Sequence, residues 1–280
     1  MHKGKRGAVC LALVMGLVLG MSGCGSAGSE SMPDLSGLGE ITACTREKAS
    51  GTRASFDDLL GLDSESESLT VAVSTEEMAS KVGESEGAIG YLTKEAAGEG
   101  LKTLTINGKA VDDSKYPLTR KLYLAYQDNL SDLGKEFVTY ATGKGQEIVG
   151  KSFETVGSAG TFLSLKPSGT LTIGGSSSEA PVMEELAKAY MEINPNARIT
   201  VETTDSGDGI NGAMQGTYQL GMSSREPKDY EKSLLTFTAV AKDRIAVVVP
   251  EANPLTDITV EKLRNIYSGS YTNWTDLTKG

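Results

Sequence analysis

Histidine and cysteine are almost absent from this chain of 280 residues. There is one histidine, His2, and there are three cysteines, Cys10, Cys24 and Cys44. Without a histidine in the body of the chain, neither a Ser-His-Asp triad nor a histidine-ligated zinc site can be built. If Cys10 leaves with a signal peptide and Cys24 carries a lipid, as argued below, Cys44 has no partner for an intrachain disulfide. These absences exclude most hydrolases, and we interpret Cys44 as a small buried residue.

Basic residues are outnumbered by acidic ones. The chain has 27 lysines and arginines against 37 aspartates and glutamates, which gives a formal net charge of −10. This balance argues against nucleic acid or an anionic membrane surface as a partner. It does not exclude a small anion, because anion sites are local and are often built from backbone N–H groups.

Signals for a metal or a cofactor are also missing. The acidic run at residues 63–67 lacks the spacing and the glycine of a calcium-binding loop, and we interpret it as a solvated loop. No Walker-type Gly-Lys-Thr loop is present. We therefore expect no metal site and no cofactor.

The N-terminus has the pattern of a secretory signal peptide. Three basic residues among the first six positions precede an uninterrupted apolar run at residues 8–19, which is too short for a comfortable membrane span. Cys24 follows a Ser-Gly pair in a way that resembles a bacterial lipobox. We therefore expect a lipoprotein signal peptide at residues 1–23, lipid attachment at Cys24, a tether at residues 24–37 and extracytoplasmic anchorage to the cell membrane. The alternative is ordinary secretion with an incidental cysteine.

Strand-like and helix-like segments alternate along the rest of the chain. A buried strand at residues 41–45, for example, is followed by a helix at residues 54–60. Such alternation is typical of an α/β fold with mainly parallel sheets. Residues 101–111 differ, because the pair Asn107 and Gly108 predicts a β-hairpin with a type I′ turn.

Three junctions between a strand and a helix are rich in glycine, serine and threonine. They lie at residues 46–53, 174–178 and 205–209. The first N–H groups of a helix have no internal partner, and the helix dipole leaves partial positive charge there. Glycine lets the backbone approach a ligand, each hydroxyl adds a donor, and Arg46 adds a permanently charged guanidinium. Three such junctions that converged on one point would hold a tetrahedral oxyanion without a metal.

Each junction also has a simpler interpretation on its own. Serine and glycine before a helix commonly act only as an N-cap. The three junctions together, one of them carrying Arg46, Lys48 and Arg53 in an otherwise acidic chain, favour an anion site.

Taken together, these segments resemble the phosphate-binding proteins of ABC phosphate importers. The sequence Arg-Glu-Lys-Ala-Ser-Gly-Thr-Arg at residues 46–53 is the most specific part of the resemblance. The other matching segments are residues 87–92, 145–146, 174–182, 205–210, 221–226 and 271–277. The resemblance implies an α/β, two-lobe fold of the type II periplasmic-binding-protein class, with the ligand in the cleft between the lobes.

The matching segments stand in an unusual order. Members of this family usually open with the block that forms the second half of this chain, so the resemblance implies a circular permutation. The former ends would then be bridged by a linker at about residues 155–169. The resemblance further implies a discontinuous lobe II, residues 38–98 and 248–280, and a nearly continuous lobe I, residues 99–247, which close on the ligand by a hinge motion. The alternative is a misassembled or engineered gene.

The resemblance also implies which residues contact phosphate. They are Ser177, Ser178, Ser206, Arg46, Ser50, Gly51, Thr52 and Ser224. At the position of Ser224 some members have a carboxylate that accepts a proton from phosphate, so selectivity against sulfate stays open here. Asp205 or Asp208 is an alternative acceptor, although each suits a helix start. Arg225 is interpreted either as positive charge at the cleft or as one partner of a surface ion pair.

The resulting hypothesis is a lipid-anchored solute-binding protein rather than an enzyme. It would capture inorganic phosphate as a monomer and deliver it to the permease of an ABC importer, without nucleic acid as a partner. Three alternatives stay open: a phosphatase or phosphoryl-transfer enzyme, a phosphate-sensing or adhesive lipoprotein, and a binder of another oxyanion such as sulfate or phosphonate.

Overall fold

The computed structural model describes residues 32–279, so the expected signal peptide, Cys24 and most of the expected tether lie outside it. The strands are β1 (Thr42–Arg46), β2 (Thr70–Ala72), β3 (Ala88–Thr93), β4 (Leu101–Thr103), β5 (Thr105–Ile106), β6 (Thr119–Tyr126), β7 (Gly169–Ser176), β8 (Ala197–Thr204), β9 (Leu220–Ser223), β10 (Thr236–Pro250) and β11 (Asp257–Ile258). The α-helices are α1 (Gly51–Leu60), α2 (Thr75–Gly83), α3 (Asp132–Thr142), α4 (Gln146–Val149), α5 (Ala180–Ile193), α6 (Ser206–Gln215), α7 (Asp229–Lys232) and α8 (Val260–Tyr267), and the 3-10 helices are η1 (Ser36–Leu38), η2 (Lys94–Ala96) and η3 (Trp274–Thr278). Within the described part of the chain, no helix has the length and apolar character needed to cross a bilayer.

The main sheet combines two parallel groups of strands with an antiparallel centre. Its order is β2-β1-β3-β10-β6-β9-β7-β8, with β4 also paired to β10. β1 runs parallel to β2 and β3, and β7 runs parallel to β8 and β9. β10 runs antiparallel to β3 and to β6, and β6 runs antiparallel to β9, so β10 and β6 join the two groups. The alternation of strands and helices predicted from the sequence is therefore confirmed.

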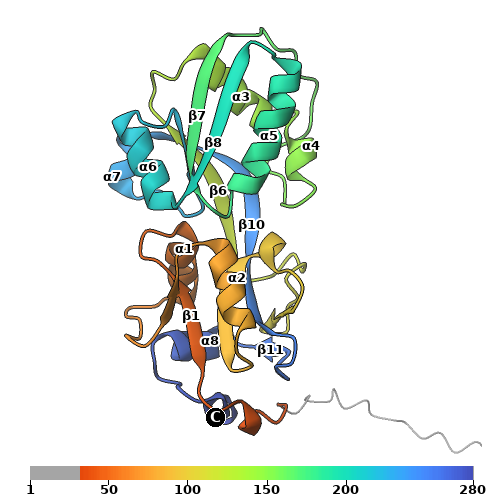
Figure 1. Ribbon diagram of the computed structural model, residues 1–280, viewed down its shortest axis with the longest axis vertical. Coiled ribbons are helices and arrows are strands. Elements are labelled where there is room, and N and C mark those ends of the chain that lie inside the picture. The colour runs from red at the N-terminus through yellow and green to blue at the C-terminus, as the bar shows by residue number, and fades with distance from the viewer. Residues whose placement is uncertain (1–31, 280) are drawn as a thin grey trace, which may run out of the picture. The chain divides into compact units, whose positions relative to one another are not determined.

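β10 belongs to both groups of strands. Its residues from Thr236 to Arg244 pair with β6, and its residues from Ile245 to Pro250 pair with β3 and β4 (Figure 1). The largest hydrophobic core is formed within residues 122–241, which we call lobe I, and the next within residues 35–118 and 245–277, which we call lobe II. Each lobe also contains one smaller cluster. Two cores joined by crossing strands are the architecture that the family resemblance implied.

The cores place the boundary between the lobes later in the chain than the sequence resemblance did. Residues 99–118 were expected in lobe I, but Leu104 and Tyr116 are buried in the core of lobe II. The reason is strand pairing, because β4 pairs with β10 and β5 pairs in parallel with β11. Leu35, expected in the tether, is also buried in this core, since burying an apolar side chain is favourable by about 25 cal/mol per Å².

The predicted hairpin forms only at its turn. Asn107 and Gly108 have φ angles of 53° and 68°, as a type I′ turn requires, and Ile106 pairs with Lys109 across the turn. The pairing does not continue, because β4 and β5 take β10 and β11 as their partners instead.

The helices that follow these strands begin with polar caps. The side chain of Ser50 accepts a hydrogen bond at the start of α1, that of Ser74 at the start of α2 and that of Asp205 at the start of α6. In Figure 1, α1 and α2 lie beside β1 in lobe II, and α5 and α6 lie beside β7 and β8 in lobe I. β1 and β7 run in opposite directions within the sheet, so the capped helix starts of lobe II and those of lobe I point toward each other.

Candidate functional site

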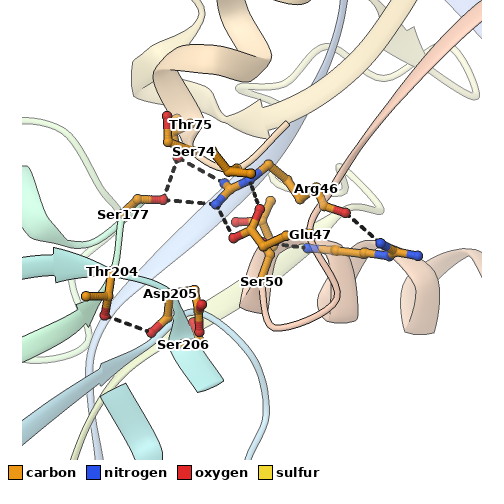
Figure 2. Close-up of polar contacts among 12 residues, drawn as sticks. Arg46, Glu47, Ser50, Ser74, Thr75, Ser177, Thr204, Asp205 and Ser206 are labelled. Atoms are coloured by element: carbon orange, nitrogen blue, oxygen red, sulfur yellow. Dashed lines mark hydrogen bonds and ion pairs between the residues drawn. The ribbon is translucent and has the colours of Figure 1, made fainter. Parts of the chain in front are cut away.

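Four strand ends lead directly into helix starts. β1 is followed by α1, β2 by α2, β7 by α5 and β8 by α6. Within each parallel group the carboxyl ends lie at one edge of the sheet, where ligands of open α/β sheets bind. The two groups run in opposite directions, so these two edges face each other. Figure 2 shows that side chains from all four junctions, among them Arg46, Thr75, Ser177 and Ser206, lie in one region.

Arg46 connects three of these junctions. The residue is only 2% exposed. Its Nη1 donates to Thr75 Oγ1 at 3.3 Å and its Nη2 donates to Ser177 Oγ at 3.3 Å, while the two hydroxyls lie 3.1 Å apart (Figure 2). Ser177 belongs to lobe I and the other two residues belong to lobe II. These hydrogen bonds therefore join the lobes.

Two further contacts link the lobes at the start of α1. Thr52 Oγ1 and Ser178 Oγ are 3.0 Å apart, and Ser55 Oγ donates to the carbonyl of Ser224 at 3.0 Å. Within lobe I, the hydroxyl of Ser206 accepts from the Ser224 amide at 3.0 Å and lies 3.3 Å from the Ser224 hydroxyl. The junctions thus present a cluster of buried hydroxyl groups, each of which can donate a hydrogen bond.

Gly51 lies at a close approach between the lobes. A Cβ atom at this position would lie 2.2 Å from Ser206 Oγ and 2.7 Å from Ser224 Oγ, which is well inside contact distance. The amide of Gly207 also donates to the carbonyl of Ala49 at 3.1 Å. Only glycine at position 51 allows the first turn of α1 to meet the loop that begins α6.

A carboxylate also lies in this cluster. Glu47 accepts from Arg46 Nε and from Arg46 Nη2, both at 2.8 Å, so the pair is bidentate (Figure 2). The side chain of Glu47 is 20% exposed, whereas that of Arg46 is 3% exposed. Arg46 still directs Nη1 and Nη2 toward Thr75 and Ser177.

All the phosphate contacts expected from the sequence are buried in this region. They are Arg46, Ser50, Gly51, Thr52, Ser177, Ser178, Ser206 and Ser224. The hydroxyl of Ser50 is already used as the N-cap of α1, where it accepts from the Arg53 amide at 3.3 Å. Its hydrogen is still free to be donated, because a hydroxyl both donates and accepts. The structure brings these residues together, and their contact with phosphate stays a prediction.

Three charged residues near the site, Asp205, Asp208 and Arg225, each have two interpretations from the sequence. Asp205 Oδ1 accepts from the Asp208 amide at 2.8 Å as the N-cap of α6, and Asp208 is exposed, so both are helix-start residues. Arg225 forms a bidentate pair with Glu231, with N–O distances of 2.8 and 2.7 Å. Burial raises the pKa of Glu231, but the hydrogen bonds from Arg225 and from the Lys228 amide outweigh burial and hold that pKa below its usual value.

Cys44 is fully buried as a free thiol in the strand that precedes the Arg46 loop. Burial raises the pKa of this thiol to about 11. A thiol that stays protonated is a poor nucleophile, which supports the interpretation of Cys44 as a packing residue.

Sequence reasoning missed Thr75 and Glu47. A signal for Thr75 was available, because the Ser74-Thr75 pair follows a short strand that runs parallel to β1 and ends beside it. Glu47 adjoins Arg46 in the sequence, but its side chain direction depends on the loop conformation, which no local pattern specifies.

A buried carboxyl group adjoins the site in lobe I. Glu179, the residue before α5, is fully buried, and its carboxyl oxygens have no hydrogen-bond partner among the described residues. Burial raises the pKa of Glu179 well above its usual value, although the positive charge of Arg120 opposes this. Arg120 Nη1 also donates to the carbonyl of Ser224 at 3.3 Å. Glu179 and Arg120 are therefore buried behind the cluster of hydroxyls, and burial favours the protonated form of Glu179.

A cavity of about 260 Å³ reaches the site from the surface between the lobes. Its lining includes Thr75, Ser177, Ser178, Phe153 and Pro181. The buried hydroxyls are therefore next to a space that a small molecule can enter.

Comparisons with known proteins point to one family. A family model described as the PBP superfamily domain matches residues 162–280. The phosphate-binding protein PstS 2 of Streptococcus agalactiae serotype V is 33% identical over 94% of this chain and 96% of that protein. A crystal structure of a phosphate-binding protein of a phosphate ABC transporter from Streptococcus pneumoniae TIGR4 superposes with a TM-score of 0.69 at 33% identity, over 85% of this chain and all of that chain.

The extent of a match depends on the relative. The alignment with the S. agalactiae protein follows both chains almost from end to end, which requires the same order of segments in both. The phosphate-binding protein PstS of Bacillus subtilis is 34% identical, but over only 116 residues, which are 40% of this chain and 38% of that protein. The order of segments seen here therefore also occurs in a natural streptococcal relative, which argues against a misassembled gene.

Proposed function

This chain belongs to the PstS family of phosphate-binding proteins, and we propose from this premise that it captures inorganic phosphate between its lobes for an ABC importer. The observation that carries the proposal is the position of Arg46. Its guanidinium is buried and reaches hydroxyls from both lobes, Thr75 and Ser177, at 3.3 Å each.

The chemistry of the site suits a tetrahedral oxyanion. Each helix start offers backbone N–H groups and the positive end of a helix dipole, and hydroxyls and a guanidinium supply further donors. Burial strengthens these interactions because the local dielectric is low. We assign no catalytic step to the site, and its role is passive capture followed by release to the permease.

Lobe closure is the second part of the proposal. The bonds from Arg46 to Ser177 and from Ser55 to Ser224 cross between the lobes and hold the site closed. β6 and β10 form the connection between the lobes and are suited to act as the hinge. In an open form, phosphate would first meet one lobe and would then take over the bonds that Arg46 makes to the other.

We further propose that Glu47 supplies the proton acceptor that Ser224 does not. Its carboxylate lies 2.8 Å from the same Arg46 Nη2 that reaches Ser177, so it is next to the expected position of the anion. Phosphate carries a proton that it can donate to this carboxylate, whereas sulfate has none. Repulsion by Glu47 would then count against sulfate and favour phosphate.

Location and assembly are the finer parts of the proposal. We propose that the chain is anchored to the outer side of the cell membrane through a lipid on Cys24 and that it works as a monomer. The relatives named above are phosphate-binding proteins, one of them of an ABC transporter, which favours delivery to a permease over a sensing or adhesive role.

The test is a calorimetric titration of the mature chain, residues 24–280 with Cys24→Ser to prevent lipidation, with phosphate and with sulfate as competitor. We expect tight binding of phosphate that sulfate does not displace. Arg46→Ala should weaken binding severely without loss of the fold. A folded protein that binds neither anion would reject phosphate capture, and stronger binding of sulfate would change the ligand.

A further inference from the structure

Arg53 is the second arginine of the loop that contains Arg46, and it faces away from the cluster of hydroxyls toward the loop itself. It lies in the first turn of α1 and is 9% exposed. Its Nη1 donates to the backbone carbonyl of Arg46 at 2.6 Å. This bond closes the loop between the end of β1 and the start of α1.

The remaining donors of Arg53 are held by a carboxylate from a different segment. Nε donates to Glu65 Oε1 at 2.8 Å, and Nη2 donates to Glu65 Oε2, so the pair is bidentate. Asp57 Oδ2 lies 3.8 Å from Arg53 Nε. Nε, Nη1 and Nη2 of Arg53 are all engaged in this way. Glu65 thus has a defined partner, although the sequence indicated only a solvated acidic loop.

The peptide of Arg46 is fixed from both sides by this arrangement. The Tyr91 hydroxyl accepts from the Arg46 amide at 3.3 Å and lies 2.7 Å from Thr45 Oγ1. Arg53 holds the carbonyl of the same residue. A long side chain delivers its end group to a defined place only if its backbone is fixed, since a small backbone rotation moves the guanidinium by a larger distance.

From this geometry we propose that Arg53 is a positioning residue for Arg46 and that Glu65 sets its orientation. Arg53 does not contact the ligand. It holds the Arg46 carbonyl in place, so that Nη1 and Nη2 of Arg46 point at the position of the anion. The inference rests on the proposed capture of phosphate by Arg46.

Positioning of the backbone matters more for an arginine at position 46 than it would for a lysine. A guanidinium is a planar fork whose donors have fixed directions, whereas a lysine ammonium is a point charge with rotatable donors on a flexible stem. A fork needs accurate placement of its backbone, and an ammonium needs it much less. The effect of Arg53 on binding should therefore depend on which residue stands at position 46.

The test is a double-mutant cycle on the phosphate Kd of the mature chain, read by calorimetry. Arg53→Met should weaken phosphate binding by about tenfold, in line with the loss of a hydrogen bond from a charged group. With Arg46→Lys as the background, the same substitution should weaken binding by about twofold or less. Arg53→Lys should restore part of the loss, because it can still donate to the Arg46 carbonyl.

Arg264→Met is a matched control. Arg264 Nε donates to the carbonyl of Leu60 at 2.5 Å, so this arginine holds a carbonyl at the other end of α1. Its replacement should lower the melting temperature but leave the phosphate Kd within about twofold. If Arg53→Met fails to fold, Glu65→Gln takes its place, because it leaves Arg53 present but loosens its orientation. We expect about a threefold loss of affinity for it, again smaller in the Arg46→Lys background.

The outcomes separate this inference from the proposed function. Equal losses in the wild-type and Arg46→Lys backgrounds, or an unchanged Kd in folded Arg53→Met, would overturn the positioning role while leaving phosphate capture intact. A wild-type protein that is folded but does not bind phosphate would overturn both.

Discussion

Arg120 and Asp243 face each other across the two strands that connect the lobes. They are register partners on β6 and β10, and Arg120 Nη2 lies 2.7 Å from Asp243 Oδ2. Their side chains are 3% and 1% exposed. Thr93 Oγ1 donates to Asp243 Oδ1 at 2.9 Å, and Arg120 Nη1 donates to the carbonyl of Ser224 in the candidate site. The pair therefore links the strands that connect the lobes to the candidate site.

Breaking this pair should destabilise the protein strongly. Asp243→Ala leaves Arg120 buried without its partner, and we expect the free energy of unfolding to fall by about 3–5 kcal/mol in urea denaturation. Lys144→Ala removes an exposed pair with Glu147 and should change stability by less than about 1 kcal/mol. A double substitution, Arg120→Met with Asp243→Leu, should be less damaging than Asp243→Ala alone, because no unpaired charge is then buried. A double variant that is less stable than Asp243→Ala would contradict this account.

Gly51→Ala should separate folding from ligand capture. The added Cβ would lie 2.2 Å from Ser206 Oγ, so the lobes could not close as they do here. We expect phosphate binding to weaken by about a hundredfold or more, because the closed form becomes a small fraction of the population. Each lobe keeps its own core, so the melting temperature should change little. Gly83→Ala is a matched control in a helix, with open space around the new Cβ, and should leave the phosphate Kd unchanged.

Glu47→Gln should change selectivity more than it changes the fold. The substitution removes the negative charge that lies beside Arg46 but keeps the size of the side chain. We expect sulfate to bind at least about tenfold more tightly than in the wild type, and phosphate affinity to change by a smaller factor, as measured by competition calorimetry. Glu261→Gln, an exposed glutamate in the first turn of α8, is the control. The same shift in both variants would remove Glu47 from the selectivity proposal.

Asp57 should make the stability of the protein depend on pH. Burial, followed by the nearby charge of Glu65, raises the pKa of Asp57 to about 7, although Arg53 opposes this. Between about pH 4 and pH 7 the folded state therefore binds more protons at this site than the unfolded state, so wild-type stability falls as the pH rises through this window. Asp57→Asn removes the ionisation and should stabilise the protein at pH 8 but not at pH 4.5. We expect a difference of roughly 1–2 kcal/mol in urea unfolding, allowing for partial solvent exposure of the carboxyl. An equal effect at both pH values would contradict the shifted pKa.

The fold and much of the site followed from local patterns in the sequence. The serine- and glycine-rich junctions around Arg46, Ser177 and Ser206 are helix starts, and the structure places all three junctions together. Local chemistry was enough for this because capping residues and parallel-strand ends have strong sequence signals. The resemblance to phosphate-binding proteins added the contact residues and the two-lobe arrangement.

The parts that were missed depend on pairings between distant segments. Residues 99–118 were assigned to the wrong lobe because β5 pairs with β11, which lies about 150 residues later in the chain. The ion pair between Glu65 and Arg53 could not be predicted, since no local sequence pattern at either position indicates which residue it pairs with. Single-sequence patterns describe elements well and the contacts between elements poorly.

Local sequence patterns also do not reveal the permuted order of the segments, which is seen only by comparison with relatives. The B. subtilis relative aligns over only 40% of this chain, which is what a permuted order predicts, because one continuous alignment can follow only one half of a permuted pair. The streptococcal relative aligns over 94%, so permutation relative to the usual family order would be shared by that protein.

The connection between α4 and β7 offers a test of this interpretation. No helix or strand occurs between residues 151 and 168 apart from a bridge at Glu154, and Leu163 and Leu165 are each 87% exposed. We expect thermolysin to make its first cut near these leucines, because exposed apolar side chains in irregular backbone are accessible to a protease. Replacing both leucines with serine should slow the cut, and a first cut near the exposed Val71 and Val73 instead would contradict the assignment.

The nicked protein should stay folded and should still bind phosphate. The cut divides the chain into one fragment with β1 to β6 and another with β7 to β11, and β10 of the second pairs with β3, β4 and β6 of the first. Arg46 then lies on one fragment and Ser177 on the other, so binding requires that the two remain associated. Size-exclusion chromatography of the nicked protein should give one peak, and calorimetry should give a phosphate Kd within about threefold of the intact chain. Separation of the fragments, or loss of binding in an intact nicked complex, would mean that residues 155–169 support the fold rather than only bridging two former chain ends.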